Sequence, residues 1–217
     1  MKSNLNIHTE QLFVEAYGGR QAEWYASLLS DVIKHGKAGN ILDLGAGLGL
    51  FVELAHKWGI AAAGLEASSY AVVESLKRAP GINMQLHDLG DLLPIPNGSV
   101  SNVMLFQVVE HIDIKRFHVL LAECHRVLEQ GGMLFIYSPS KYNVKERLEP
   151  THINMMLPSE LKRKLKSFGY RVLYQPDHGL WFTATNIRIV NIAAKALLFL
   201  FPHDWFSASA NAIAQKI

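Results

Sequence analysis

The sequence has only one cysteine and no long apolar run without charges. These two features exclude some kinds of bond and some locations for the protein. With Cys124 alone an intrachain disulfide is excluded, and its helical surroundings favour a small core residue over a nucleophile. No stretch of about 18 apolar residues is free of charges, so no membrane span is expected. Residues 1–6 contain no apolar run of the kind that a signal peptide needs. We therefore expect a cytoplasmic protein.

Positive and negative charges nearly balance, because the net charge is only +2 over 217 residues. A balance this close to neutral gives no argument for a nucleic-acid partner. Apolar residues make up 49% of the chain and charged residues 18%, which predicts a large buried core. The length fits one domain.

One stretch, residues 40–49, reads Asn-Ile-Leu-Asp-Leu-Gly-Ala-Gly-Leu-Gly and joins a strand pattern to a helix pattern. Its apolar residues predict a short buried strand, and its three alternate glycines predict a turn whose backbone N–H groups face a hollow. Asp43 places a carboxylate beside that hollow. A dinucleotide fingerprint is the competing interpretation, but Leu50 stands where its third glycine is needed, and Asp43 would repel a pyrophosphate. An acid at this point suits a cationic ligand.

Strand-like and helix-like patterns alternate along the chain. Strands are expected at 41–44, 60–65, 82–86, 100–108, 133–137, 170–174 and 209–217, and helices at 10–35, 49–58, 69–78, 113–129 and 158–168. This alternation predicts an α/β fold with a doubly wound, mostly parallel seven-stranded sheet and a helical insertion before the last strand. The single domain 1–217 divides into an N-terminal helical cover (1–38), a core (39–176), the insertion (177–208) and the last strand (209–217).

Carboxylates follow the second and third expected strands as well as the first. In open parallel sheets, ligands bind beyond these carboxyl ends. Glu66 could accept both hydroxyls of a ribose there, while Asp88 accepts from the exocyclic amine of adenine and Leu89 packs on the ring. A capping carboxylate is the simpler interpretation of each acid alone, but their joint placement favours a binding site.

Five motifs follow one another in a fixed order between residues 38 and 175. They are Asp-x-Gly-x-Gly-x-Gly, an acid after the second strand, an acid after the third, Val-Val-Glu-His after the fourth and Gly-Gly-x-Leu into the fifth. Together they resemble the class I S-adenosylmethionine-dependent methyltransferases, especially their small-molecule branch. The stretch Glu-Pro-Thr-His at 149–152 and the following helix start also look like that branch. Ser101 departs from the family pattern, which usually has Asp there, but that position is mainly structural.

The resemblance implies a Rossmann-like methyltransferase fold with S-adenosylmethionine as the cofactor. Asp43 would anchor the methionine ammonium, and Phe106 and Gln107 would line the channel of the methyl donor. The full set of cofactor-binding residues that we expect is Arg20, Asp43, Gly45, Ala46, Gly47, Gly49, Glu66, Ala67, Asp88, Leu89, Phe106 and Gln107. Within this set, Arg20 would pair with the cofactor carboxylate. No metal site is assigned.

Two histidines are candidates for a catalytic base. His111 follows the fourth strand at the mouth of the cofactor site, and His152 lies in the long polar loop 139–157, which should cover the substrate. A hydrogen-bonded structural histidine or a helix cap explains either residue equally well.

The insertion contains a strongly apolar segment, residues 187–201. Its only polar residues, Arg188, Asn191 and Lys195, would share one face of a helix. A helix that covers the sheet, or a dimer contact, is the simpler interpretation. The alternative is a lid or an interfacial helix that handles an apolar substrate.

The expected activity is methyl transfer from S-adenosylmethionine to an oxygen of a small-molecule, sugar or lipid-like acceptor, with an apolar portion in the acceptor and a homodimer left open. A nucleic-acid methyltransferase is disfavoured by the small net charge and because Gln-Val-Val-Glu stands at 107–110 in place of an Asn-Pro-Pro-Tyr type motif. A non-catalytic cofactor-binding or scaffold protein is the alternative from another class.

Overall fold

The computed structural model describes residues 21–174 and 207–217. Arg20 and the expected helix at 187–201 lie outside the described residues, as does nearly all of the insertion.

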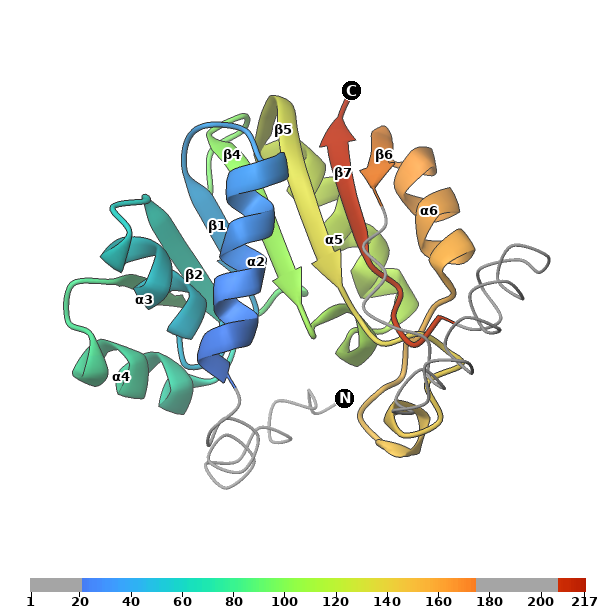
Figure 1. The fold of residues 1–217 in the computed structure, drawn as a ribbon, viewed down its shortest axis with the longest axis horizontal. Helices are drawn as coiled ribbons and strands as arrows, with labels where there is room; N and C mark the ends of the chain where they lie inside the picture. The colour runs from blue at the N-terminus through green and yellow to red at the C-terminus, as the bar shows by residue number, and fades with distance from the viewer. Residues whose placement is uncertain (1–20, 175–206) are drawn as a thin grey trace, which may run out of the picture.

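A seven-stranded sheet forms the centre of the molecule (Figure 1). Its strands are β1 (Ile41–Leu44), β2 (Ala62–Glu66), β3 (Asn83–Leu86), β4 (Val100–Phe106), β5 (Leu128–Tyr137), β6 (Tyr170–Tyr174) and β7 (Ala212–Lys216). They lie in the order β3-β2-β1-β4-β5-β7-β6, and the first five are parallel to one another. β7 runs antiparallel to both β5 and β6. The predicted doubly wound, mostly parallel seven-stranded sheet is therefore confirmed.

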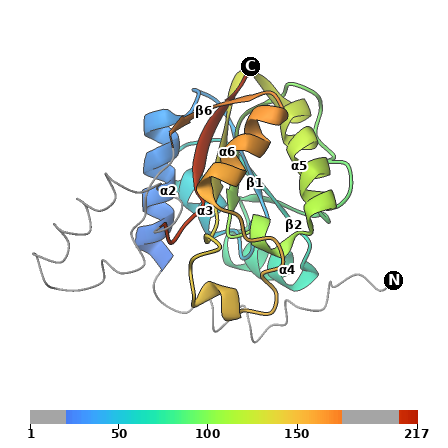
Figure 2. The ribbon, with the colours of Figure 1, turned by 90° about the vertical axis from the view of Figure 1, so that its right-hand side faces the viewer.

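Helices cover both faces of this sheet (Figure 2). They are α2 (Gln21–His35), α3 (Leu50–Lys57), α4 (Ser69–Arg78), α5 (Ile114–Val127) and α6 (Pro158–Ser167), with two short 3-10 helices, η1 (Val109–His111) and η2 (Glu146–Leu148). Figure 2 shows α2 on one side of the sheet and α5 and α6 on the other. Among the described residues, no helix combines the length and the apolar character needed to cross a membrane.

Alternate residues of the central strands pack on opposite faces, and this builds two main cores. Ile41, Met104 and Phe135 pack with Leu28 and Phe51 on the face that α2 and α3 cover. The residues next to them along the strands point the other way, into a core shared with α5 and α6; they include Leu42, Val103, Leu105, Leu134 and Ile136. Because both faces are buried, the strands read as continuous apolar runs.

Cys124 belongs to the α5 side of the core and is fully buried. Burial raises the pKa of its thiol well above the usual range, and the neighbouring carboxylate of Glu123 adds to that shift. A thiol that stays protonated is a poor nucleophile. The structure thus confirms Cys124 as a core residue.

Several element boundaries differ from the sequence-based expectations. The helix expected at 113–129 ends at Val127, and β5 begins immediately at Leu128 rather than at Met133. Gly131 and Gly132 lie inside β5, where the pairing with β4 shifts register between Val100 and Asn102. The glycines therefore mark an irregularity in a strand, as glycines within strands often do, and not a loop before one.

The fourth strand also ends earlier than expected, at Phe106 instead of residue 108. Gln107 has a left-handed backbone with φ of 55° and ends the strand, and η1 follows. A positive φ is uncommon in a residue other than glycine and concentrates at functional sites. It turns the chain at the edge where the parallel strands end.

Candidate active site at the carboxyl edge of the sheet

Glu66 closes the glycine turn between β1 and α3. Its Oε2 accepts a hydrogen bond from the backbone N–H of Gly47 at 2.8 Å, and its Oε1 accepts one from the backbone N–H of Ser68 at 2.8 Å. Ala67, between Glu66 and Ser68 in the chain, is half-buried. Glu66 is the last residue of β2 and is only 6% exposed. Because each carboxylate oxygen can accept more than one hydrogen bond, Glu66 remains able to accept from a ribose.

The glycines of the turn serve packing as well as backbone conformation. Gly45 and Gly49 both have positive φ, 74° and 68°. A Cβ on Gly45 would lie 2.5 Å from Val108, and one on Gly49 would lie 3.1 Å from the sulfur of Met84. Protein side chains therefore fill the space where a Cβ would stand at these two positions. Buried Ala46 follows Gly45, and both backbone N–H groups donate to Leu65.

Asp43 is a buried carboxylate without a hydrogen-bonding partner in the part of the chain that the structure describes, and it is 4% exposed. Burial, and then the negative charge of Glu66, raise the pKa of Asp43 from 3.8 to about 7. Two buried acids at the ends of neighbouring strands are costly when, among the described residues, no cation pairs with Asp43. A ligand with an ammonium group would offset that cost, so this edge fits the amino-acid part of S-adenosylmethionine.

Asp88 lies on the same edge but already has a protein partner. Its Oδ1 accepts from the guanidinium of Arg116 at 2.5 Å and from the backbone N–H of Gly90 at 2.9 Å. Burial would raise the pKa of Asp88, but these hydrogen bonds outweigh it and hold the pKa below its usual value. Asp88 is therefore ionised, and among the described residues no donor to its second oxygen competes with an adenine amine. Leu89 is 8% exposed and belongs to the core, which leaves it little surface for a ligand.

An aromatic group that the sequence did not single out surrounds Phe106 at the end of β4. The rings of Trp24 and Tyr25 from α2 and of Tyr137 from β5 approach it edge to face, with centroids 5.9 to 6.4 Å away. Trp24 remains 57% exposed. Gln107 is exposed beside them, and its N–H donates to the carbonyl of Tyr137 at 2.8 Å. These residues come from three elements, so no local pattern could have predicted the group.

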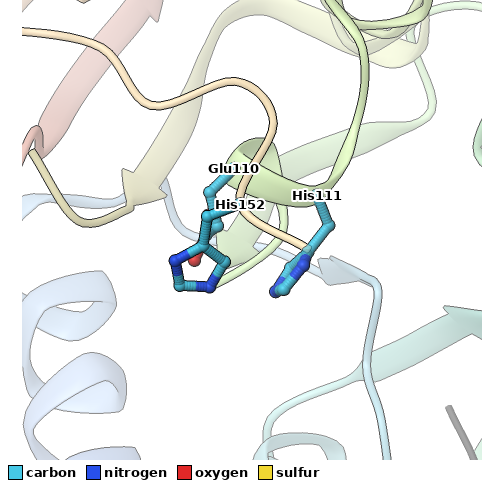
Figure 3. Close-up of side chains that lie close together, drawn as sticks. All are labelled: Glu110, His111 and His152. Atoms are coloured by element: carbon cyan, nitrogen blue, oxygen red, sulfur yellow. The ribbon is translucent and has the colours of Figure 1, made fainter. Parts of the chain in front are cut away.

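The two candidate histidines lie together (Figure 3), although they come from η1 and from the loop before α6. Their ring centroids are 4.8 Å apart. Nδ1 of His152 is 2.8 Å from the carbonyl oxygen of Glu146. Side-chain ligand atoms of His111, His152 and Glu110 all lie within 4.8 Å of one another. The sequence had pointed to both histidines but not to the carboxylate that completes the group.

Glu110 is fully buried next to His111. Its Oε2 accepts from the hydroxyl of Ser138 at 3.0 Å. Burial raises the pKa of Glu110 to about 7, although that hydrogen bond opposes the shift. The adjacency of an acid and a histidine after a strand was the available sequence signal, but only the fold shows that the acid points inward.

A pocket of about 380 Å³ opens beside His152. It is lined by Lys141, Tyr142, Arg147, His152, Met155 and Leu157. Lys141 is paired with Glu160 at 2.7 Å, while Arg147 is exposed. The pocket thus combines apolar walls with cationic groups at the end of the loop that the sequence placed over the substrate.

The fold and this edge of the sheet point to one class of domain. Asp43, Glu66 and Asp88 stand at the ends of three adjacent parallel strands around a glycine turn. This arrangement is that of a class I S-adenosylmethionine-dependent methyltransferase domain, and S-adenosylmethionine is the cofactor of that class.

Comparison with known families and proteins agrees with this assignment. Residues 42–136 match the family described as a methyltransferase domain. A relative from Mycolicibacterium smegmatis, named a probable S-adenosylmethionine-dependent methyltransferase, is 30% identical over 138 residues, which cover 61% of this chain and 52% of the relative. A Mycobacterium tuberculosis protein with the same description is 28% identical over 138 residues, 61% of this chain and 49% of its own. The chain thus spans about half the length of these relatives.

Solved structures show the same fold at low sequence identity. An S-adenosylmethionine-dependent methyltransferase from Archaeoglobus fulgidus has a TM-score of 0.71 and 22% identity, covering 96% of this chain and 100% of that one. The [4+2]-cyclase SpnF has a TM-score of 0.64 and 19% identity, covering 89% of this chain and 80% of that one. A fold that also occurs in a cyclase does not by itself establish the reaction.

Proposed function

We propose that the protein transfers the methyl group of S-adenosylmethionine to an oxygen of a small-molecule, sugar or lipid-like acceptor with an apolar portion. The observation that carries this proposal is the position of His152, which belongs both to the acceptor-sized pocket and to the histidine pair at the sheet edge. We also propose a cytoplasmic location.

The residues support three separate tasks. Asp43 would hold the ammonium of the cofactor, Glu66 its ribose hydroxyls and Asp88 its adenine. S-adenosylmethionine supplies a methyl group that its own sulfonium activates. The chain's remaining task is to align the acceptor and to remove a proton from it. His111 or His152 would take that proton, which an acceptor hydroxyl must lose before its oxygen can form a strong bond to carbon.

The residues that line the pocket favour an acceptor that has both an apolar part and an acidic group. Tyr142, Met155 and Leu157 offer apolar surface, while Arg147 offers a charge that could bind an acidic group. A nucleic-acid acceptor is disfavoured by the net charge of +2. A non-catalytic role would give cofactor binding without product across a broad range of acceptors.

Cofactor binding tests the first half of the proposal. S-adenosylhomocysteine should bind in calorimetry and NAD should not. Glu66→Ala should weaken binding by about 1–3 kcal/mol because buried ribose hydroxyls lose their acceptor. Glu66→Gln keeps the shape and one acceptor oxygen, and Glu74→Ala on α4 is the matched carboxylate control, expected to bind normally. Unchanged affinity in a folded Glu66→Ala variant would contradict the ribose role.

Turnover tests the second half. Incubation with labelled cofactor and fractionated host metabolites should identify an acceptor. With that acceptor, His152→Ala should lower kcat by about 10²-fold or more while leaving the affinity for S-adenosylhomocysteine nearly intact, because His152 lines the pocket and not the glycine turn. His56→Ala, an exposed histidine on α3, is the control. Equal turnover in His152→Ala and the parent would reduce His152 to a structural role.

A further inference from the structure

Glu110, His111 and His152 form a compact set of metal-ligand atoms (Figure 3). The nearest nitrogen or carboxylate oxygen atoms of all three lie within 4.8 Å of one another. In Figure 3 the two imidazoles stand side by side and point away from η1, with the Glu110 carboxylate behind the ring of His152. Two imidazoles and one carboxylate are a ligand set that zinc and other first-row divalent cations favour.

The surroundings orient His152 as a ligand. The carbonyl oxygen of Glu146 can only accept a hydrogen bond, so Nδ1 of His152, 2.8 Å away, carries the proton. Nε2 then keeps its lone pair. A histidine that donates its other N–H to a backbone carbonyl is the usual arrangement for a metal ligand. The Glu146 carboxylate, 3.7 Å from the same Nδ1, adds negative charge behind the ring.

The surroundings of Glu110 also leave one of its oxygens available to a metal ion. Ser138 donates to its Oε2, while its buried Oε1 has no hydrogen-bonding partner among the described residues. A buried carboxylate oxygen without a donor is costly, and a cation would remove that cost.

The backbone holds the two parts of the set together. Asn154 donates its N–H to the carbonyl of Glu110 at 3.0 Å and its side-chain amide to the carbonyl of Val109 at 3.2 Å. The loop that carries His152 is therefore fixed against η1, which carries the other two residues. The three ligands would be placed before any ion arrives, which lowers the cost of binding.

We propose that Glu110, His111 and His152 bind one divalent transition-metal ion, with open coordination positions toward the pocket. The part of this inference that concerns the acceptor rests on the proposed function: the ion would coordinate the acceptor hydroxyl, lower its pKa and hold its oxygen for methyl transfer, while the proton passes to solvent. This ion would replace the histidine base of the proposed function, so the two histidines would act as its ligands.

Metal binding can be measured without any acceptor. The full chain is treated with a chelator, dialysed and titrated with Zn²⁺ in calorimetry and with Co²⁺ in visible absorption. We expect one ion per chain. The visible absorption of bound Co²⁺ should have the high intensity typical of four or five ligands instead of six. His152→Asn keeps a donor at the position of Nδ1 but loses the Nε2 ligand, and Glu110→Gln keeps the shape but loses the charge. Each should weaken binding by at least about 10-fold.

The control is His56→Ala, which removes an exposed histidine remote in sequence from the set and should bind the ion normally. Circular dichroism confirms that each variant is folded. If the parent binds no ion at micromolar concentration, or if both folded variants bind as the parent does, the inference is wrong. Metal binding without methyl transfer would leave the inference standing and refute the proposed function. Methyl transfer by a chain that binds no metal would do the reverse.

Discussion

Among single residues, the pair Asp43 and Glu66 combines a cost to stability with a role in binding. Glu66 is stabilised by backbone N–H groups of the turn and of residue 68, whereas the described part of the chain gives buried Asp43 no such donor. The pair is therefore a site where the free protein gives up stability that a cationic ligand can restore.

The pKa of Asp43 predicts how stability depends on pH. The folded state holds the proton up to about pH 7, while the unfolded chain releases it near 3.8. The stability linked to this proton is complete below 3.8, falls as pH rises and is lost above about 7. Asp43→Asn mimics the protonated form, so its advantage over the parent in free energy of unfolding should grow by about 2–3 kcal/mol from pH 5 to pH 8.

Urea denaturation of both proteins at the two pH values measures this difference directly. The same variant should bind S-adenosylhomocysteine more weakly at pH 8, because the ammonium loses its anchor. A constant stability difference at the two pH values would mean that Asp43 is ionised in the folded protein.

Only some of the residues at the candidate site could be predicted from the sequence. The acids at the strand ends could be predicted because each stands at a fixed offset from an apolar run. Arg116, which pairs with Asp88, could not be predicted, because it comes from α5 and meets Asp88 only through packing. The burial of Leu89 could not be predicted either, because it too depends on packing between distant elements. Leu89 contacts the core, so little of its side chain is left exposed for a ligand.

Among the elements, the turn from β1 into α3 is the most constrained. Gly45→Ala would combine a left-handed backbone with a Cβ 2.5 Å from Val108. Gly59, with φ of 71° and nothing within 4 Å of its Cβ position, carries only the backbone cost. Gly59→Ala should therefore cost about 1–2 kcal/mol, and Gly45→Ala about 1–3 kcal/mol more.

Denaturant unfolding of both variants measures the two costs. In a double-mutant cycle, Val108→Ala should reduce the penalty of Gly45→Ala by relieving the contact. An equal penalty at the two glycines would show that the contact with Val108 is readily relaxed.

Element boundaries show the limits of a local pattern. α4 (Ser69–Arg78) lies where it was expected because Ser68 caps it, accepting from the N–H of Ala71. Gly131 and Gly132 were expected to precede the fifth strand, yet they lie within it. The pairing of Val100 with Leu128 extends β5 backward, and that pairing depends on a strand far away in the sequence.

For the molecule as a whole, the segment 187–201 remains a prediction from the sequence, because it lies outside the described residues. Its apolar surface must be buried against the sheet, a second subunit, a membrane surface or a ligand. The wider insertion, residues 177–208, also contains Trp181, Phe182 and Trp205 beside Phe199 and Phe201, and these aromatic residues favour an acceptor with an apolar portion.

Replacing Leu198 and Phe199 with Ser tests these alternatives. If this insertion supplies an apolar wall for the acceptor, as the sequence predicts, acceptor binding should be lost by a folded protein of unchanged size. Unfolding, oligomer size and acceptor binding are measured separately. Loss of stability alone, with normal acceptor affinity in the folded fraction, would identify the segment as core, and loss of a dimer would identify it as a subunit contact.

The sequence by itself determined the order of strands and helices, the glycine turn and the acids at the strand ends. Each of these depends on residues close together in the chain, through hydrophobic period, backbone freedom and short-range spacing. Only the tertiary structure decided that Glu110 joins His111 and His152, that Val108 fills the space beside Gly45 and that aromatic rings from three elements surround Phe106. These contacts join residues distant in the chain, and they exist because burying both faces of the sheet brings η1, α2 and the loop before α6 to one edge.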